Sequence, residues 1–281
     1  MPRTWLLIPA MLLAWSASVS AQLDEKQTCP MPVIAAALEK PLKLNAALQR
    51  EGGDIIDAAC KADPDHPSRM IAAIFYDSEK GPVDPYGVGH VDFAVALIDT
   101  KRSRVLALHH EVMESDAGTR YEPGSLWIDT GRYLLAPGVR AVGVRMNIWL
   151  APSAPDGGAD NFLSLFVQRG SKLIPVLDGL AMSEWRFEYE ERSWGRSGTR
   201  VDVSLQLSMA NSSTQGFHDI EVHGIREISR LGEADEQPLG PKHRRRLASL
   251  RYDGTHYESS VNSDVEAFME EALVNVRALK K

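Results

Sequence analysis

The stretch VDVSLQLSM, residues 201–209, alternates apolar and polar side chains without a break. Its odd positions are Val201, Val203, Leu205, Leu207 and Met209, and its even positions are Asp202, Ser204, Gln206 and Ser208. Successive side chains of a β-strand point to opposite faces, so this pattern predicts a strand with one face in a core and the other in water.

The same two-residue period recurs elsewhere in the chain. Residues 141–150 place apolar side chains at the even positions, and residues 181–190 place three aromatic side chains on one face. Short turns at Gly170-Ser171 and Asp253-Gly254 separate such segments, and Asp-Gly is a strong hairpin signal because both residues tolerate positive φ. These features predict antiparallel strands joined by hairpins.

Two other regions depart from this alternation. The segments MIAAIFY (70–76), FAVALI (93–98) and VLAL (105–108) are apolar at every position, which is typical of strands buried on both faces. Residues 31–61 are rich in Ala, Leu and Lys and predict one or two short helices, interrupted by Pro41 and by Gly52-Gly53.

The C-terminal residues show helical spacing. Ser263-Asp264-Val265-Glu266 fits a capping box, and apolar side chains then recur on one face as far as Leu279. This predicts one amphipathic helix, whose apolar stripe either packs on the sheet or is displayed for a partner.

The chain is therefore expected to divide into four parts: an export signal (1–21), a helical and loop segment (22–69), a β-rich domain (70–260) and a C-terminal helix (261–281). The predicted fold is mainly β, an antiparallel meander with short N-terminal helices and a C-terminal amphipathic helix. Its body is expected to be a sandwich or barrel-like, or else an open, propeller-like set of hairpins.

The first 21 residues have the features of a secretory signal. Arg3 precedes the apolar run from Trp5 to Trp15, and small residues end at Ala21. The run is shorter than the roughly 20 residues of a permanent membrane helix, although a retained anchor is the alternative. We expect a periplasmic or secreted protein with no stable membrane insertion after signal cleavage. The net charge of −7 argues against nucleic acid as a partner.

Cys29 and Cys60 are the only two cysteines. In an oxidising compartment such a pair predicts a disulfide. Two free thiols, one of them catalytic, are the alternative, but no neighbouring residue favours a thiolate.

The stretch HHEVMESD, residues 109–116, comes close to the H-E-x-x-H motif of zinc peptidases. That motif needs two histidines one helical turn apart, and the second histidine is missing here. The stretch also continues the VLAL segment, and a strand would place His110 and Glu114 about 13 Å apart, which is too far for one metal ion. The sequence predicts a strand here.

Other catalytic motifs are absent from the sequence. It contains no G-x-S-x-G, S-x-x-K or C-x-x-C, and no Gly-rich phosphate loop follows a strand. The run from Asp156 to Asn161 is rich in oxygen ligands for calcium but departs from the EF-hand pattern, and we interpret it as a turn. No catalytic residue, metal ion or cofactor is predicted.

Two surface features are candidates for binding. Arg145, Asn147 and Trp149 share the polar face of the strand predicted at 141–150, and a Trp beside an Arg suits a sugar ring or a protein hot spot. The alternative is that a second layer covers that face. The basic run Lys242-His243-Arg244-Arg245-Arg246 could meet an anionic glycan or an acidic partner, or could simply be a solvated strand entry.

The runs at 114–145, 162–180 and 250–257 resemble those of uncharacterised exported β-rich proteins of proteobacteria. The resemblance would extend from about Ala59 to Tyr257. It implies an exported β-rich domain and no particular activity.

We therefore expect an exported binding or interaction protein whose partner is an unknown protein or glycan of the cell envelope. The alternative is a cell-envelope hydrolase whose acids and bases meet only in the fold.

Overall fold

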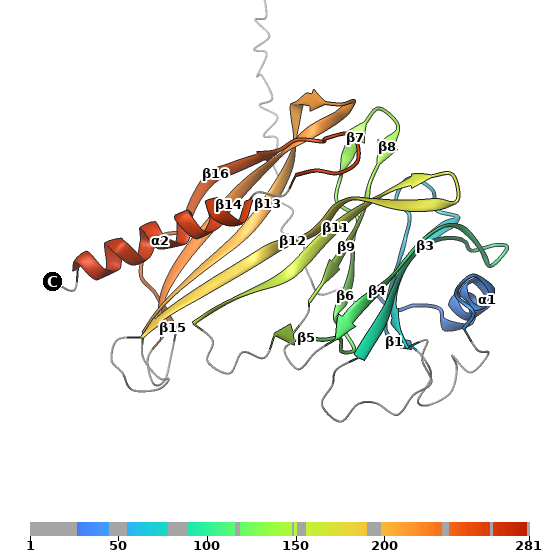
Figure 1. Cartoon of the computed structure of the whole chain (residues 1–281), viewed down its shortest axis with the longest axis horizontal. Coiled ribbons are helices and arrows are strands. Elements are labelled where there is room, and N and C mark those ends of the chain that lie inside the picture. The colour runs from blue at the N-terminus through green and yellow to red at the C-terminus, as the bar shows by residue number, and fades with distance from the viewer. Residues whose placement is uncertain are drawn as a thin grey trace, which may run out of the picture.

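The computed structural model describes residues 27–44, 55–77, 89–115, 119–147, 149–150, 156–189, 198–231, 236–258 and 261–279. The export signal expected at residues 1–21 lies outside this part. The fold is mainly β, with a nearly closed, barrel-like sheet and two helices, α1 (Met31–Leu42) and α2 (Val261–Leu279) (Figure 1). The mainly β prediction is thus confirmed, and the body is of the barrel-like kind.

The first half of the barrel is an antiparallel meander in which each strand pairs with the next. Its strands are β1 (Ile55–Ala62), β2 (Arg69–Tyr76), β3 (Gly89–Asp99) and β4 (Arg104–Ser115). The second half continues from β4 in the order β12 (Lys172–Tyr189), β11 (Gly157–Arg169), β9 (Val142–Met146) and β6 (Leu126–Asp129). The sheet curls so far that β6 lies beside β1.

The far half of β12 leaves the barrel and enters a long antiparallel sheet that we call the wing (Figure 1). The other wing strands are β13 (Gly198–Thr214), β14 (Phe217–Leu231), β15 (Glu236–Pro238) and β16 (His243–Leu250). Helix α2 covers one face of the wing. Two short pairs complete the described strands: β5 (Thr119–Arg120) with β10 (Trp149–Leu150), and β7 (Leu134–Ala136) with β8 (Val139–Arg140).

Strand β2 shows why some segments are apolar at every position. Its even residues, such as Ile74, pack beneath α1, while its odd residues, such as Phe75, fill the barrel. A strand between a helix and a barrel interior has no face in water, as the sequence predicts.

Helix α2 packs on the sheet and is not displayed away from it. Its buried side chains are Val261, Val265, Phe268, Met269, Ala272 and Leu273, and they share a core with β13 and β14. The helix begins at Val261, so Ser263 lies within its first turn and the predicted capping box is wrong. No helix in the described part of the chain is long and apolar enough to cross a membrane.

The helical prediction for residues 31–61 holds for α1 and is wrong for Ile55–Ala62, which forms β1. This segment contains three alanines, a residue that favours helices. Its register with β2 buries Ala59 in the barrel and Cys60 beneath α1, and this tertiary pairing overrides the local preference.

Two further predictions, for residues 156–161 and for residues 141–150, are corrected by the structure. The run from Asp156 to Asn161 is the start of β11 and not a turn, because Gly157 and Gly158 pair with β12. A Cβ atom on Gly158 would lie 2.9 Å from Nε1 of Trp185, so the glycine leaves room for the indole ring. The single strand predicted at 141–150 is also divided, since β9 ends at Met146 and Trp149 belongs to a different sheet.

Candidate functional site

Side chains bridge the place where the barrel closes. No ladder of backbone hydrogen bonds between β1 and β6 occurs in the described residues. Instead, the carboxylate of Asp57 on β1 accepts hydrogen bonds from the backbone N–H groups of Gly124 (3.0 Å) and Leu126 (2.7 Å). We call this junction, formed by residues 27–29, Asp57 and residues 124–128, the seam.

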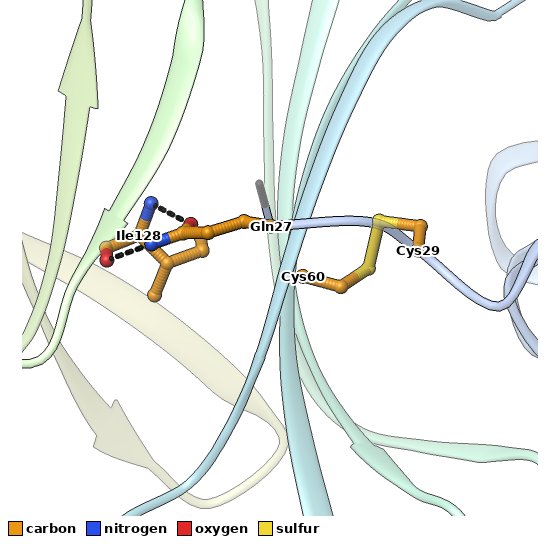
Figure 2. Close-up of a disulfide and its surroundings, with 4 residues drawn as sticks. All are labelled: Gln27, Cys29, Cys60 and Ile128. Atoms are coloured by element: carbon orange, nitrogen blue, oxygen red, sulfur yellow. Dashed lines mark hydrogen bonds between the residues drawn. A yellow bond between two sulfur atoms is a disulfide. The ribbon is translucent and has the colours of Figure 1, made fainter. Parts of the chain in front are cut away.

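Gln27 supplies the rest of the bridge. Its side-chain amide donates to the carbonyl of Ile128 over 2.9 Å and accepts from the N–H of Ile128 over 2.6 Å (Figure 2). Its own backbone carbonyl accepts from the N–H of Cys60 over 3.2 Å. Gln27 therefore lies between the two edge strands and pairs with both, one through its backbone and the other through its side chain.

A disulfide fastens this segment to β1. Cys29 and Cys60 are bonded to each other, as the sequence predicts, and no free cysteine exists in the chain (Figure 2). Because Cys29 is two residues from Gln27, the covalent bond keeps the Gln27 side chain within reach of β6.

A surface pocket with a volume of about 580 Å³ opens beside the seam. This volume lies within the range of roughly 300–1,000 Å³ that is usual for small-molecule sites. Trp127 and Arg145, which are register partners on β6 and β9, line it together with Asn147 and Asn161. Trp127 and Arg145 face away from the barrel core, because their neighbours along each strand point into it.

The pocket brings together two of the three residues that the sequence predicts for binding. Arg145 and Asn147 both line it, whereas the side chain of Trp149 lies outside the described part of the structure. Trp127 contributes the indole ring, and sequence reasoning missed it. Its alternation with Leu126 and Ile128 is a detectable strand signal, but only the β6–β9 register places it beside Arg145.

Arg145 is held by an ion pair at the side of the pocket. Its Nε donates to Asp129 over 2.7 Å, and its Nη1 donates to the side-chain oxygen of Asn161 over 3.2 Å. Burial alone would raise the pKa of Asp129. The charge of Arg145 and hydrogen bonds from Arg145, Gly131 and Tyr133 outweigh it, so the pKa stays below its ordinary value. The pair is therefore ionised at neutral pH, and the carboxylate offsets the charge of Arg145.

The remaining polar groups of the pocket suit hydrogen bonding to a ligand. The side-chain amide of Asn147 is exposed and has no partner among the described residues. Asp57 is a lining carboxylate, and backbone N–H groups already occupy both of its oxygens. Lys61 places its Nζ 5.8 Å from the centroid of the Trp127 ring, a cation–π contact that helps to fix the indole.

The two histidines of HHEVMESD lie on opposite faces of β4, which confirms the strand prediction. His109 packs against Phe93 and Phe166 in the barrel interior. His110 lies on the other face, with its Nε2 2.8 Å from the buried carboxylate of Asp92. Neither histidine lines the seam pocket, and the described residues contain no cluster of three or more His, Cys, Asp or Glu that could hold a metal ion.

The basic run at 242–246 is engaged with glutamates. Lys242 pairs with Glu227 at 2.7 Å, Arg245 with Glu271 at 2.8 Å and Arg246 with Glu221 at 3.4 Å. The run therefore forms the start of β16, and its positive charges are largely neutralised. This favours the interpretation as the solvated start of a strand over that as a binding patch.

Comparison of the chain with known protein families, curated proteins and solved structures finds no match. The function must therefore be inferred from the chemistry of the site.

Proposed function

We propose that this is an exported binding protein, periplasmic or secreted, that takes a glycan of the cell envelope into the seam pocket. The observation that carries the proposal is the indole ring of Trp127 in a pocket with the side chains of Asn147 and Arg145. A sugar ring offers an apolar C–H face that can stack on an indole, and its hydroxyl groups can pair with amide and guanidinium groups.

Two observations support export. The sequence begins with the features of a secretory signal, and the protein contains a disulfide, a bond typical of oxidising compartments.

The distribution of acids and bases favours binding over hydrolysis. A hydrolase needs a general acid or base within reach of the substrate. In the seam pocket, Asp57 is committed to two backbone N–H groups, and His109 and His110 lie elsewhere in the fold. Among its described lining residues, the pocket therefore offers contacts for a glycan and holds no acid or base besides Asp57.

The proposal can be tested by titrating the protein, purified without residues 1–21, with soluble oligosaccharides. A tetramer of N-acetylglucosamine and maltotetraose are suitable probes, with calorimetry and tryptophan fluorescence as readouts. We expect Trp127→Ala to weaken binding by about 2 kcal/mol or more. Asn147→Ala should weaken it by about 1 kcal/mol through loss of a hydrogen bond.

Two variants of exposed wing residues serve as controls. Tyr189→Ala removes an exposed aromatic ring, and Gln206→Ala removes an exposed amide, and neither residue lines the pocket. Both should bind as the wild type does. Failure of the wild type to bind either probe, or unchanged binding by Trp127→Ala, would contradict the proposal, and shortened oligosaccharides after incubation would favour a hydrolase.

A further inference from the structure

A second cavity lies at the end of the barrel where several strand connections meet. Its volume is about 400 Å³, and the connections β1–β2, β6–β7 and β7–β8 contribute to its wall together with the end of β11. It shares no lining residue with the seam pocket. The two cavities can therefore be tested separately.

The floor of this cavity is apolar. Ile71, Leu97 and Leu173, which belong to the barrel core, line it, and Phe217 from the start of β14 adds an aromatic side chain. Such a floor favours a ligand with a hydrocarbon part, because burial removes apolar surface from water.

Two arginines at the rim, Arg69 and Arg169, form no ion pair with a described residue. Arg69 is half-buried, and its side chain makes no hydrogen bond or ion pair with any described residue. Arg169 donates to the phenol oxygen of Tyr252 over 3.0 Å, and a neutral phenol leaves its charge in place. A half-buried guanidinium group without an ionic partner, such as that of Arg69, is costly, and the exposed guanidinium group of Arg169 lies on the same rim. Both groups are therefore natural contacts for an anion.

Two of the three carboxylates of the rim are already paired with arginines. Arg140 lies 2.9 Å from Asp65, and Asp129 is held by Arg145. Asp63 accepts a hydrogen bond from the N–H of Asp65 and lies 3.4 Å from His66. An imidazole offsets the Asp63 carboxylate only when it is protonated, so the described lining holds at most one unpaired carboxylate against the guanidinium groups of Arg69 and Arg169. The excess charge of the cavity is therefore positive.

We propose that this cavity binds an amphipathic anion, a carboxylate or phosphate that carries an acyl chain. Arg69 and Arg169 hold the head group, since the guanidinium fork matches the geometry of both anions. The chain lies on the floor formed by Ile71, Leu97 and Leu173. Both a free fatty acid and a phospholipid contain this chemistry.

The tail is tested by calorimetry with monomeric alkanoates. Butyrate, hexanoate, octanoate and decanoate are titrated into the full mature chain, and we expect the affinity to rise by up to roughly fourfold for each buried methylene group. The head is tested by comparing octanoate with 1-octanol, which should bind about tenfold more weakly or worse because it lacks the charge. Octyl phosphate against octanoate then distinguishes a phospholipid-type head from a fatty acid.

Arginine variants test the assignment to this cavity. Arg69→Gln and Arg169→Gln should each weaken decanoate binding by about tenfold or more. Arg102→Gln is the matched control, because Arg102 is exposed on the neighbouring β3–β4 turn, pairs with Asp99 and does not line the cavity. Urea midpoints within experimental error of the wild type show that each variant is folded.

Several results would overturn the proposal: no binding of any alkanoate or octyl phosphate, equal binding of octanoate and 1-octanol, equal binding of acetate and decanoate, or unchanged binding by both arginine variants. Trp127→Ala should bind decanoate as the wild type does. A failure of the glycan proposal would therefore leave this result unaffected.

Discussion

The side-chain amide of Gln27 pairs with both backbone groups of Ile128, accepting from the N–H over 2.6 Å and donating to the carbonyl over 2.9 Å. A neighbouring strand would normally satisfy these two groups of an edge strand. Here one side chain does so at the seam, because a primary amide carries the same donor and acceptor as a peptide bond.

Gln27→Glu tests this pairing. At neutral pH the carboxylate still accepts from the N–H of Ile128, but its second oxygen faces the carbonyl that formerly received a hydrogen bond. We expect the free energy of unfolding to fall by about 1–3 kcal/mol in urea titrations. Gln206→Glu, at an exposed position on β13, should change it by less than about 0.5 kcal/mol. Equal effects of the two changes would mean that the paired amide contributes nothing.

Removing the disulfide should destabilise the protein substantially. The bond joins residues 31 positions apart, and the double variant Cys29→Ser/Cys60→Ser should lower the free energy of unfolding by roughly 3–4 kcal/mol. Intact mass after alkylation without reductant provides an independent check. The native protein should take up no alkyl group, and uptake of two would show that the cysteines are free.

The Asp129–Arg145 pair predicts a pH dependence. The pKa of Asp129 is lower in the folded protein than the reference value of 3.8, so its ionised form stabilises the fold above pH 3.8. This contribution is lost as the pH falls through the lowered pKa of the folded state. The difference in unfolding free energy between the wild type and Asp129→Asn should therefore be constant above pH 3.8 and shrink below it. Glu258→Gln, at an exposed carboxylate, is the control.

Phe268 should anchor α2 to the wing. Its ring is buried, with the guanidinium carbons of Arg226 and Arg245 at 4.5 and 4.4 Å from its centroid. We expect Phe268→Ala to cost about 3–5 kcal/mol of unfolding free energy in urea melts. Val274→Ala, on the exposed side of the same helix, should cost less than about 0.5 kcal/mol. Similar costs for the two variants would show that the helix is not held through Phe268.

The sequence predictions succeed where neighbouring residues determine the local structure. They fail where contacts between residues from separate segments determine it. The alternation in residues 201–209 places Val201, Val203 and Leu205 in the core, because strand geometry alone fixes the period. The helical prediction for residues 31–61 fails at β1, because the pairing of β1 with β2 has no local signal strong enough to offset three alanines.

The candidate site shows the same limit. Alternation correctly places Arg145 and Asn147 on the side of the strand away from the barrel core, and both line the seam pocket. Trp127 could not be assigned to the site without the β6–β9 register, which joins residues from separate segments. The roles of Gln27 and Asp57 could not be predicted either, because a side chain that replaces a strand has no recognisable spacing in the sequence.

The seam also has a kinetic consequence. Gln27 and Ile128 are 101 residues apart in the chain, and Asp57 and Leu126 are 69 apart, whereas β1 to β4 each pair with the next strand. Contacts of high sequence separation form late, since the entropy of loop closure opposes them until other contacts exist. We expect the meander of β1 to β4 to form first and the barrel to close afterwards. In the native protein, the amides of Gly124, Leu126 and Ile128 should then be among the earliest in the barrel to exchange their hydrogens through local opening.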